Sequence, residues 1–424
     1  MVLKNAQKIC LVTTGQPSTN PRLVKEADAL SEAGYDVAVI CAHWANWADK
    51  TDEALLASKI WGKSVTYVGG KLNSSELKHL WTRARHGLTR RVSEVIGDRV
   101  PNEWIISRVT PELTAAACQT KADLYIAHNL GALPAAVHAA KRNDAKVGFD
   151  AEDFHSGMSA NPDDDRLARS VEAEFIASCD YLTAASPGIA RAYAETYQVE
   201  TPATVLNVFP LAERPEKFRE QKQDQPLRLY WFSQSIGPER GIEDVVAAMG
   251  QLLSGRVELH LRGQWMGQYQ NELLTFAASQ NVDAARIVWH EPAEPNQMAR
   301  LASQFDIGLA PELPTCRNRQ ICISNKLFTY MLAGNAVVAT NTEGQFEILS
   351  RTPGIGFSYE PGDVGSLAKQ LEIWCDDRKS LNDARVASWE AGTHQYNWDI
   401  EKHKFLNVVE NVLQPPAQTS RHVA

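Results

Sequence analysis

Short apolar runs alternate with helical patterns along most of this 424-residue chain. The first run, Ile9 to Thr13, leads into a small polar loop, and a helical pattern from Pro21 to Ala33 stops at Gly34. A second apolar run follows from Asp36 to Cys41. A strand, a loop, a helix and a second strand in this order predict the opening of a doubly wound parallel sheet.

The same alternation continues and then begins again after a polar stretch at 207–226, which we interpret as a linker region. Further strands are predicted in the first half at 65–68, 124–127, 147–150 and 181–184, and in the second half at 227–232, 257–261, 287–290, 307–310 and 336–339. The pattern therefore predicts an α/β protein with two Rossmann-like doubly wound domains, residues 1–206 and 227–395, facing a central cleft. The polar tail at 415–424 is predicted to be flexible.

Composition narrows the possible classes of function. The formal net charge of −8 argues against a general nucleic-acid binder, which normally carries a basic excess. Seven cysteines without paired-ligand spacing predict reduced, buried thiols and a cytoplasmic protein. No stretch of about twenty apolar residues is present, and Met1 to Gln7 lacks the apolar core of a signal peptide, so we expect no membrane span.

The segment from Ser324 to Thr340 is the strongest candidate for binding chemistry. It reads as a polar loop, a short helix stopped by Gly334, and a buried strand. Ser324 and Asn325 are typical N-cap residues whose side chains would accept from free backbone N–H groups. A helix N-terminus with Lys326 in its first turn, beside the end of a parallel strand, predicts an anion site that could receive a diphosphate.

A second cation is predicted at the same edge of the same sheet. The loop after strand 227–232 contains Ser235, Gly237 and Arg240, and arginine suits bidentate phosphate recognition. The structural alternative is a simple turn with a solvated arginine. Together with Lys326, however, Arg240 would supply the pair of cations that a diphosphate leaving group needs.

In the first half, polar residues follow three predicted strands. Gly15 and Gln16 come after the first strand, where a small residue lets a ligand approach the backbone, although a plain turn fits equally well. His128 ends a strand and would face the cleft, the alternative being a structural histidine. Asp150 and Asp153 lie in an acidic loop that could orient an acceptor hydroxyl or supply a general base.

Asp163, Asp164 and Asp165 form a motif that could be mistaken for a metal site. They follow Asn161-Pro162 and open a helical pattern, where carboxylates complement the helix dipole without any metal. We therefore predict no metal site in this chain.

These segments resemble the glycosyltransferase group 1 family, whose enzymes have the two-domain GT-B fold. The residues kept from the family's donor-binding signature are Lys326, Tyr330, Gly334, Val337 and Val338. The chain departs from it at Thr329, where the family usually has a ribose-binding glutamate, and at Ile321, where a second glutamate would fall. The resemblance also implies a helix at 396–414 that crosses back to the first domain.

The resemblance implies transfer of a sugar from a nucleotide diphosphate sugar to a hydroxyl acceptor, with retention and without a metal or other cofactor. The residues it implies for catalysis are His128, Arg240 and Lys326. Those implied for donor binding are Gly15, Ser235, Gly237, Asn325, Thr329 and Glu347, and those on the acceptor side are Gln16, Asp150 and Asp153. The alternatives are a non-catalytic GT-B protein that binds a partner or a glycan, favoured by Thr329 and Ile321, and a nucleotide-sugar epimerase.

The acceptor implied by the resemblance is a glycan or a lipid-linked saccharide of surface polysaccharide synthesis. The basic stretch from Lys78 to Arg91, with Trp81 inside it, fits a peripheral contact with anionic lipid headgroups. Its structural alternative is a solvated helix face.

Overall fold

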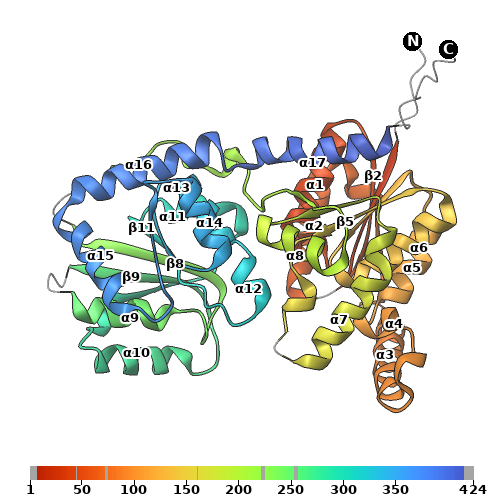
Figure 1. Cartoon of the computed structure of the whole chain (residues 1–424), viewed down its shortest axis with the longest axis horizontal. Coiled ribbons are helices and arrows are strands. Elements are labelled where there is room, and N and C mark those ends of the chain that lie inside the picture. The colour runs from red at the N-terminus through yellow and green to blue at the C-terminus, as the bar shows by residue number, and fades with distance from the viewer. Residues whose placement is uncertain are drawn as a thin grey trace, which may run out of the picture. The chain divides into compact units, whose positions relative to one another are not determined.

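The computed structural model describes residues 7–43, 45–71, 75–159, 161–220, 225–252 and 256–414; the predicted tail at 415–424 lies outside them. The chain forms two compact units (Figure 1). The first takes the chain up to Ala185, Ile189–Val205 and the chain from Lys402, and the second takes Ser186–Gly188 and Leu206–Glu401.

A seven-stranded parallel sheet in the order β3-β2-β1-β4-β5-β6-β7 forms the centre of the first unit. Its strands are β1 (Lys8–Thr13), β2 (Asp36–Ala42), β3 (Val65–Val68), β4 (Leu124–His128), β5 (Lys146–Ala151), β6 (Tyr181–Ala184) and β7 (Ala203–Thr204). Thr13 pairs with His128 across β1 and β4, where the strand order reverses. Such a reversal is the point at which open parallel sheets bind ligands.

The helices of the N-terminal half are α1 (Pro21–Glu32), α2 (Asp49–Ser58), α3 (Glu76–Ile96), α4 (Asn102–Ile106), α5 (Thr110–Gln119), α6 (Leu133–Asn143), α7 (Pro162–Phe175) and α8 (Pro187–Tyr197). Helix α1 shows why these segments are helical. The Asn20 side chain accepts from the Leu23 N–H at 3.1 Å, and Pro21 occupies the first helical turn. The apolar face of α1 is buried, and Gly34 follows its end with φ +92°.

The second unit contains a six-stranded parallel sheet in the order β10-β9-β8-β11-β12-β13. Its strands are β8 (Leu227–Ile236), β9 (Val257–Trp265), β10 (Ile287–His290), β11 (Ile307–Ala310), β12 (Ala336–Thr340) and β13 (Gly356–Tyr359). Its helices are α9 (Ile242–Gln251), α10 (Tyr269–Ser279), α11 (Met298–Ala302), α12 (Arg317–Ile321), α13 (Asn325–Ala333), α14 (Glu343–Arg351), α15 (Val364–Asp376), α16 (Arg378–His394) and the first residues of α17 (Trp398–Leu413). The strand order reverses between β8 and β11.

The sheet of the second unit has apolar side chains on both faces. Leu229 and Trp231 of β8, Leu259 of β9, Leu309 of β11 and Val338 of β12 lie on one face, are at most 1% exposed and belong to one core cluster, and Tyr230 and Val337 on the other face are fully buried. Burial on both faces explains why the strands appear in the sequence as continuous apolar runs. None of the helices in the described part of the chain is long and apolar enough to cross a bilayer.

Three details differ from the sequence predictions. Strand β8 continues through a bulge between Phe232 and Ser235, so Ser235 pairs with Gln264 of β9 instead of lying in a loop. The side chain of Ser324 does not cap α13, because its hydroxyl donates to Glu312. Strand β13 was not predicted, because Gly356 to Ser358 are only partly buried and break the apolar run.

Candidate functional site

The strand reversal of the second unit brings charged side chains together. The loop after β8 carries Arg240, the residue pair Pro311-Glu312 follows β11, and Lys326 lies in the first turn of α13. Since β8 and β11 are parallel neighbours, their carboxyl ends open at one edge of the sheet.

Lys326 and Glu312 form a partly buried ion pair at this edge. The Lys326 Nζ lies 2.7 Å from Glu312 Oε1, and the Ser324 hydroxyl donates to the same oxygen at 2.9 Å. The two side chains are 15% and 18% exposed. Burial would raise the pKa of Glu312, but the charge and hydrogen bond of Lys326 outweigh it and lower that pKa. The carboxylate is therefore ionised at neutral pH and neutralises Lys326.

Arg240 lies in a loop whose backbone is closely constrained. Glu239 has φ +60°, and Gly241 has φ +73° at the N-cap of α9. A Cβ on Gly241 would lie 1.9 Å from the carbonyl oxygen of Pro311, so only glycine fits there. Among the described residues, Arg240 has no hydrogen-bond or ion-pair partner, although its charge contributes to lowering the pKa of Glu312. Its guanidinium is thus available to a ligand.

The other predicted donor-binding residues lie in varied environments. Asn325 is exposed at the start of α13, and Gly237 packs so closely on Met266 that a Cβ would lie 2.6 Å from its sulfur. Thr329 is 1% exposed, and its hydroxyl donates to the Asn325 carbonyl at 3.4 Å. Glu347 forms an ion pair with Arg351 at 2.6 Å along α14. Contact of these residues with a nucleotide sugar stays a prediction.

At the strand reversal of the first unit, four charged side chains contact one another. Arg22 of α1 holds Asp150 through two hydrogen bonds, from Nε at 2.6 Å and from Nη2 at 2.8 Å. The His128 ring lies 3.2 Å from Glu26 and 3.4 Å from Asp150. All four side chains are at most 1% exposed, and we call them the buried charge cluster. Sugar contact by His128, and acceptor contact by Asp150, stay predictions.

The pKa values in the buried charge cluster follow from its contacts. Burial lowers the pKa of His128, but Glu26 and Asp150 outweigh it and raise that pKa to about 10. Burial would raise the pKa of Asp150, yet the Arg22 guanidinium holds it well below its usual range. Burial and the neighbouring Asp150 raise the pKa of Glu26. At neutral pH the cluster therefore contains a protonated His128 and an ionised Asp150.

Two groups of acids could suggest a metal. Within the described ranges, only Glu26, His128 and Asp150 are close enough together to share one ion, and the cation Arg22 already binds Asp150 there. The motif that starts at Asp163 lies in the first turn of α7, where Asp163 accepts from Arg166 at 2.6 Å.

The loop after β1 connects to a neighbouring group of carboxylates. The amide of Gln16, which is fully buried, donates to Asp52 at 2.9 Å and to Asp49 at 3.3 Å, and its oxygen accepts from the Ala45 N–H at 2.7 Å. Gly15 lies in the same loop, where a Cβ would meet the Thr19 hydroxyl at 3.0 Å. Asp153 is only partly buried, and its carbonyl oxygen accepts from the Tyr193 hydroxyl at 3.1 Å. Gln16 thus holds the carboxylates of Asp49 and Asp52 in place by hydrogen bonds from the loop after β1.

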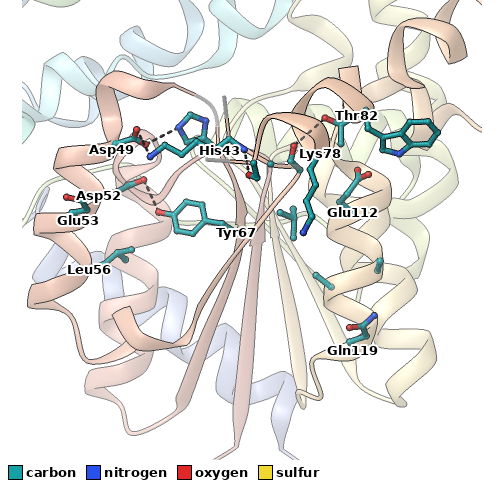
Figure 2. A pocket seen from close by; sticks show the side chains of 18 residues that line it. His43, Asp49, Asp52, Glu53, Leu56, Tyr67, Lys78, Thr82, Glu112 and Gln119 are labelled. Carbon is teal, nitrogen blue, oxygen red and sulfur yellow. Dashed lines mark hydrogen bonds and ion pairs between the residues drawn. The ribbon is translucent and has the colours of Figure 1, made fainter. Parts of the chain in front are cut away.

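Asp49 and Asp52 line a cavity of about 750 Å³ that lies wholly within the first unit (Figure 2). Asp49 and Asp52 come from α2, Tyr67 and Gly70 from the end of β3, and Glu112 from α5. Tyr67 donates to Asp52 at 2.9 Å, while Lys71 and His43 both contact Asp49. Figure 2 shows Asp52 and Tyr67 on one side of the cavity and Lys78 and Glu112 on the other. Its size is that of a small-molecule site.

Sequence reasoning did not identify Glu312 or this cavity. The signal for Glu312 was present, because it lies two residues beyond the carboxyl end of the buried strand β11, at the edge where parallel sheets bind ligands. The cavity had no such signal, since its lining comes from separate segments between His43 and Gln119.

Comparison with known proteins supports the expected class. Residues 228–377 match the family model described as glycosyl transferases group 1. A comparison with curated proteins gives no match.

Solved structures resemble the chain along its whole length. Anabaena HepE in complex with UDP is 15% identical with a TM-score of 0.68, covering 96% of this chain and 100% of that one. Sucrose-phosphate synthase from Thermosynechococcus elongatus is 14% identical with a TM-score of 0.71, covering 96% and 99%. S. aureus TarM, in a complex that includes UDP, is 9% identical with a TM-score of 0.67, covering 96% and 100%. The chain thus has the GT-B fold of these structures, and its residues 228–377 are similar to the glycosyl transferases of group 1.

Proposed function

We propose that the chain is a glycosyltransferase that moves a sugar from a nucleotide diphosphate sugar to a hydroxyl acceptor. The observation that carries this proposal is the pair of cations, Arg240 and Lys326, at the strand reversal of the second unit, inside the region that matches the family. Because HepE and TarM were each solved in complex with UDP, UDP is the first nucleotide to test.

In this mechanism the two cations bind the departing diphosphate. Negative charge grows on the leaving group as the glycosidic bond breaks, and fixed cations lower the free energy of that state. The N-terminal amides of α13 add a favourable dipole beside Lys326. The reaction needs no metal in this proposal, because Arg240 and Lys326 take the role that a metal ion would have, and we propose retention of configuration as in the resembled family.

For the acceptor we propose the cavity of the first unit. Its carboxylates can accept hydrogen bonds from sugar hydroxyls, and the ring of Tyr67, which is 44% exposed, offers an apolar surface to a sugar face. Gln16 would act as a positioning residue that holds Asp49 and Asp52. We propose a glycan or lipid-linked saccharide as acceptor, in surface polysaccharide synthesis on the cytoplasmic side of a membrane.

The competing function is a GT-B protein that binds a partner or a glycan without catalysis. Both positions where the family has glutamates are occupied here by buried residues without a carboxylate, since Ile321 is fully buried and Thr329 is 1% exposed. This observation favours the competing function, whereas the free guanidinium of Arg240 favours catalysis.

Binding of UDP, GDP and ADP, measured by calorimetry with the intact chain and with Arg240→Ala, tests the proposal. A charged hydrogen bond contributes about 1.5–3 kcal/mol, so this variant should bind the preferred nucleotide roughly ten- to a hundredfold more weakly. The free energy of unfolding should stay within about 0.5 kcal/mol, because Arg240 has no partner among the described residues.

Arg166→Ala is the matched control, because Arg166 lies on α7 and its side chain is 74% exposed. This variant should bind nucleotides as the intact chain does. Absence of binding to all three nucleotides would reject catalysis in favour of the competing function. Equal affinity of Arg240→Ala and the intact chain would reject the role of Arg240.

A further inference from the structure

Asn129 has a backbone conformation that is nearly confined to glycine. It directly follows β4 at the strand reversal of the first unit, and its φ of +68° is combined with a ψ of 158°. A residue with a Cβ is strained in this region, and the strain persists only where the surrounding structure fixes it. Glycine at position 129 would remove the strain. The side chain that is present instead therefore needs an explanation.

The side chain of Asn129 holds the loop after β1. Its Oδ1 accepts from the Thr14 hydroxyl at 2.9 Å, and its Nδ2 donates to the Thr13 hydroxyl oxygen at 3.0 Å. The same Thr13 oxygen accepts from the Gly15 N–H at 3.4 Å. Because Thr13 is fully buried at the end of β1, these contacts tie the start of the loop to the sheet.

The loop that Asn129 holds supplies most of the hydrogen bonds to Asp52, a carboxylate of the cavity in the first unit. Asp52 is 4% exposed and accepts from the Gln16 amide at 2.9 Å and from the Ser18 N–H at 2.8 Å. Its third donor is the Tyr67 hydroxyl at 2.9 Å (Figure 2). Two of the three donors thus belong to the loop after β1, and the position of the carboxylate depends on the position of that loop.

The connection from Asn129 to the cavity is short. Only Gly15 separates Thr14 from Gln16, whose carbonyl oxygen accepts from the Thr19 hydroxyl at 2.7 Å and from the Thr19 N–H at 3.0 Å. A shift of the loop at Thr14 would therefore move Gln16 as well. Asn129 itself does not line the cavity, so it can act on a ligand there only through this loop.

We propose that Asn129 is a positioning residue that fixes the loop after β1, and through it the carboxylate of Asp52, for binding a sugar in the cavity. The proposal rests on the proposed function for the identity of the ligand. Hydrogen-bonding groups of a site work only when they are held within about 0.5 Å of the productive geometry. The strained backbone of Asn129 is tolerated because its side chain provides this restraint, which glycine cannot provide.

Three substitutions of Asn129 separate positioning from stability. Asn129→Gly removes the strain together with both side-chain hydrogen bonds, so the midpoint of urea unfolding should stay near that of the intact chain. Asn129→Ala loses the same hydrogen bonds and keeps the strain, so its midpoint should be lower than that of Asn129→Gly. Asn129→Asp is the conservative variant, because its two oxygens can accept from the hydroxyls of Thr13 and Thr14.

Hydrogen exchange followed by mass spectrometry tests the restraint of the loop without any ligand. The amides of Ser18 and Thr19 are hydrogen-bonded in the intact chain. They should exchange at least about tenfold faster in Asn129→Gly, and close to the original rate in Asn129→Asp. Asn281→Gly is the matched control, because Asn281 is an exposed asparagine of the second unit with a φ of +59°. Equal exchange of the loop in Asn129→Gly and the intact chain would overturn the proposal.

Binding of simple sugars tests the effect of the loop on the cavity. The probes are the methyl glycosides of glucose, galactose, mannose and N-acetylglucosamine, titrated by NMR, with UDP titrated in parallel. The glycoside that the intact chain binds best should bind at least about tenfold more weakly to Asn129→Gly and as well as before to Asn129→Asp and Asn281→Gly. The affinity for UDP should be the same in all of them, because the diphosphate site lies in the second unit.

Absence of glycoside binding to the intact chain would overturn the proposal, and so would equal glycoside affinity of Asn129→Gly and the intact chain. Recovery of binding in Asn129→Asp distinguishes positioning from a general effect on the fold, since a purely structural role would change the unfolding midpoint and not the affinity of the folded protein. Failure of the proposed function would appear differently, as absence of nucleotide binding to the intact chain, and would leave the exchange and glycoside comparisons unchanged.

Discussion

At the β1/β4 reversal of the first sheet, four charged side chains contact one another and are at most 1% exposed. At the β8/β11 reversal of the second sheet, Lys326 and Glu312 remain 15% and 18% exposed. The topology is the same at both places, but the charges have different partners. In the first unit every cation of the cluster faces a carboxylate, whereas in the second Arg240 has no partner among the described residues. A strand reversal therefore offers a site, and unpaired charge decides whether that site can bind an anion.

The largest effect is expected from Asp150→Asn in the buried charge cluster, because this substitution removes the carboxylate that Arg22 and His128 share. Breaking a buried ion pair leaves an uncompensated charge, which costs about 3–5 kcal/mol. Urea unfolding should show a loss of that size in the free energy of unfolding. The control Asp163→Asn, at a side chain that is 81% exposed, should change it by less than about 0.5 kcal/mol. A loss below about 1 kcal/mol for Asp150→Asn would mean that the cluster does not stabilise the fold.

The sequence predicted the sheets but not this cluster, for a physical reason. A strand covered on both faces must be apolar, so the buried strands 181–184 and 307–310 were located to the residue. Arg22 gave no such signal, since a charged residue in the first turn of a helix is usually solvated. Only the folded chain brings Arg22 within 2.6 Å of Asp150, 128 positions away.

The pH dependence of the free energy of unfolding tests whether His128 of the same cluster is protonated in the folded protein. The pKa of His128 in the folded protein is about 10, because Glu26 and Asp150 outweigh burial, against about 6.5 in an unfolded chain. The folded protein therefore holds a proton that the unfolded chain releases between these values. The stabilisation is complete below about pH 6.5 and is lost as the pH rises toward 10.

Urea unfolding at pH 7.5 and 9.5 should accordingly show a decline that is steeper for the intact chain than for His128→Gln, by up to about 1.4 kcal/mol per pH unit. The slopes, and not the absolute stabilities, carry the test, because the substitution also removes buried contacts with Glu26 and Asp150. His394→Gln, at a side chain that is 72% exposed, should keep the slope of the intact chain. Identical slopes for the intact chain and His128→Gln would mean that His128 is not protonated in the folded state.

The smallest expected effect is a change in nucleotide affinity when Glu312 is replaced at the strand reversal of the second sheet. Glu312→Gln removes the negative charge beside Lys326 but keeps an oxygen that can accept from Ser324 and Lys326. If Lys326 binds the diphosphate, the variant should bind the preferred nucleoside diphosphate several-fold more tightly. The reason is that an interaction between two partly exposed charges contributes about 1 kcal/mol. The gain should shrink for the nucleoside monophosphate and disappear at high salt, because it is electrostatic. Weaker binding of the diphosphate would instead show that Glu312 holds Lys326 in position for the ligand, so that the carboxylate serves the site and does not merely neutralise it.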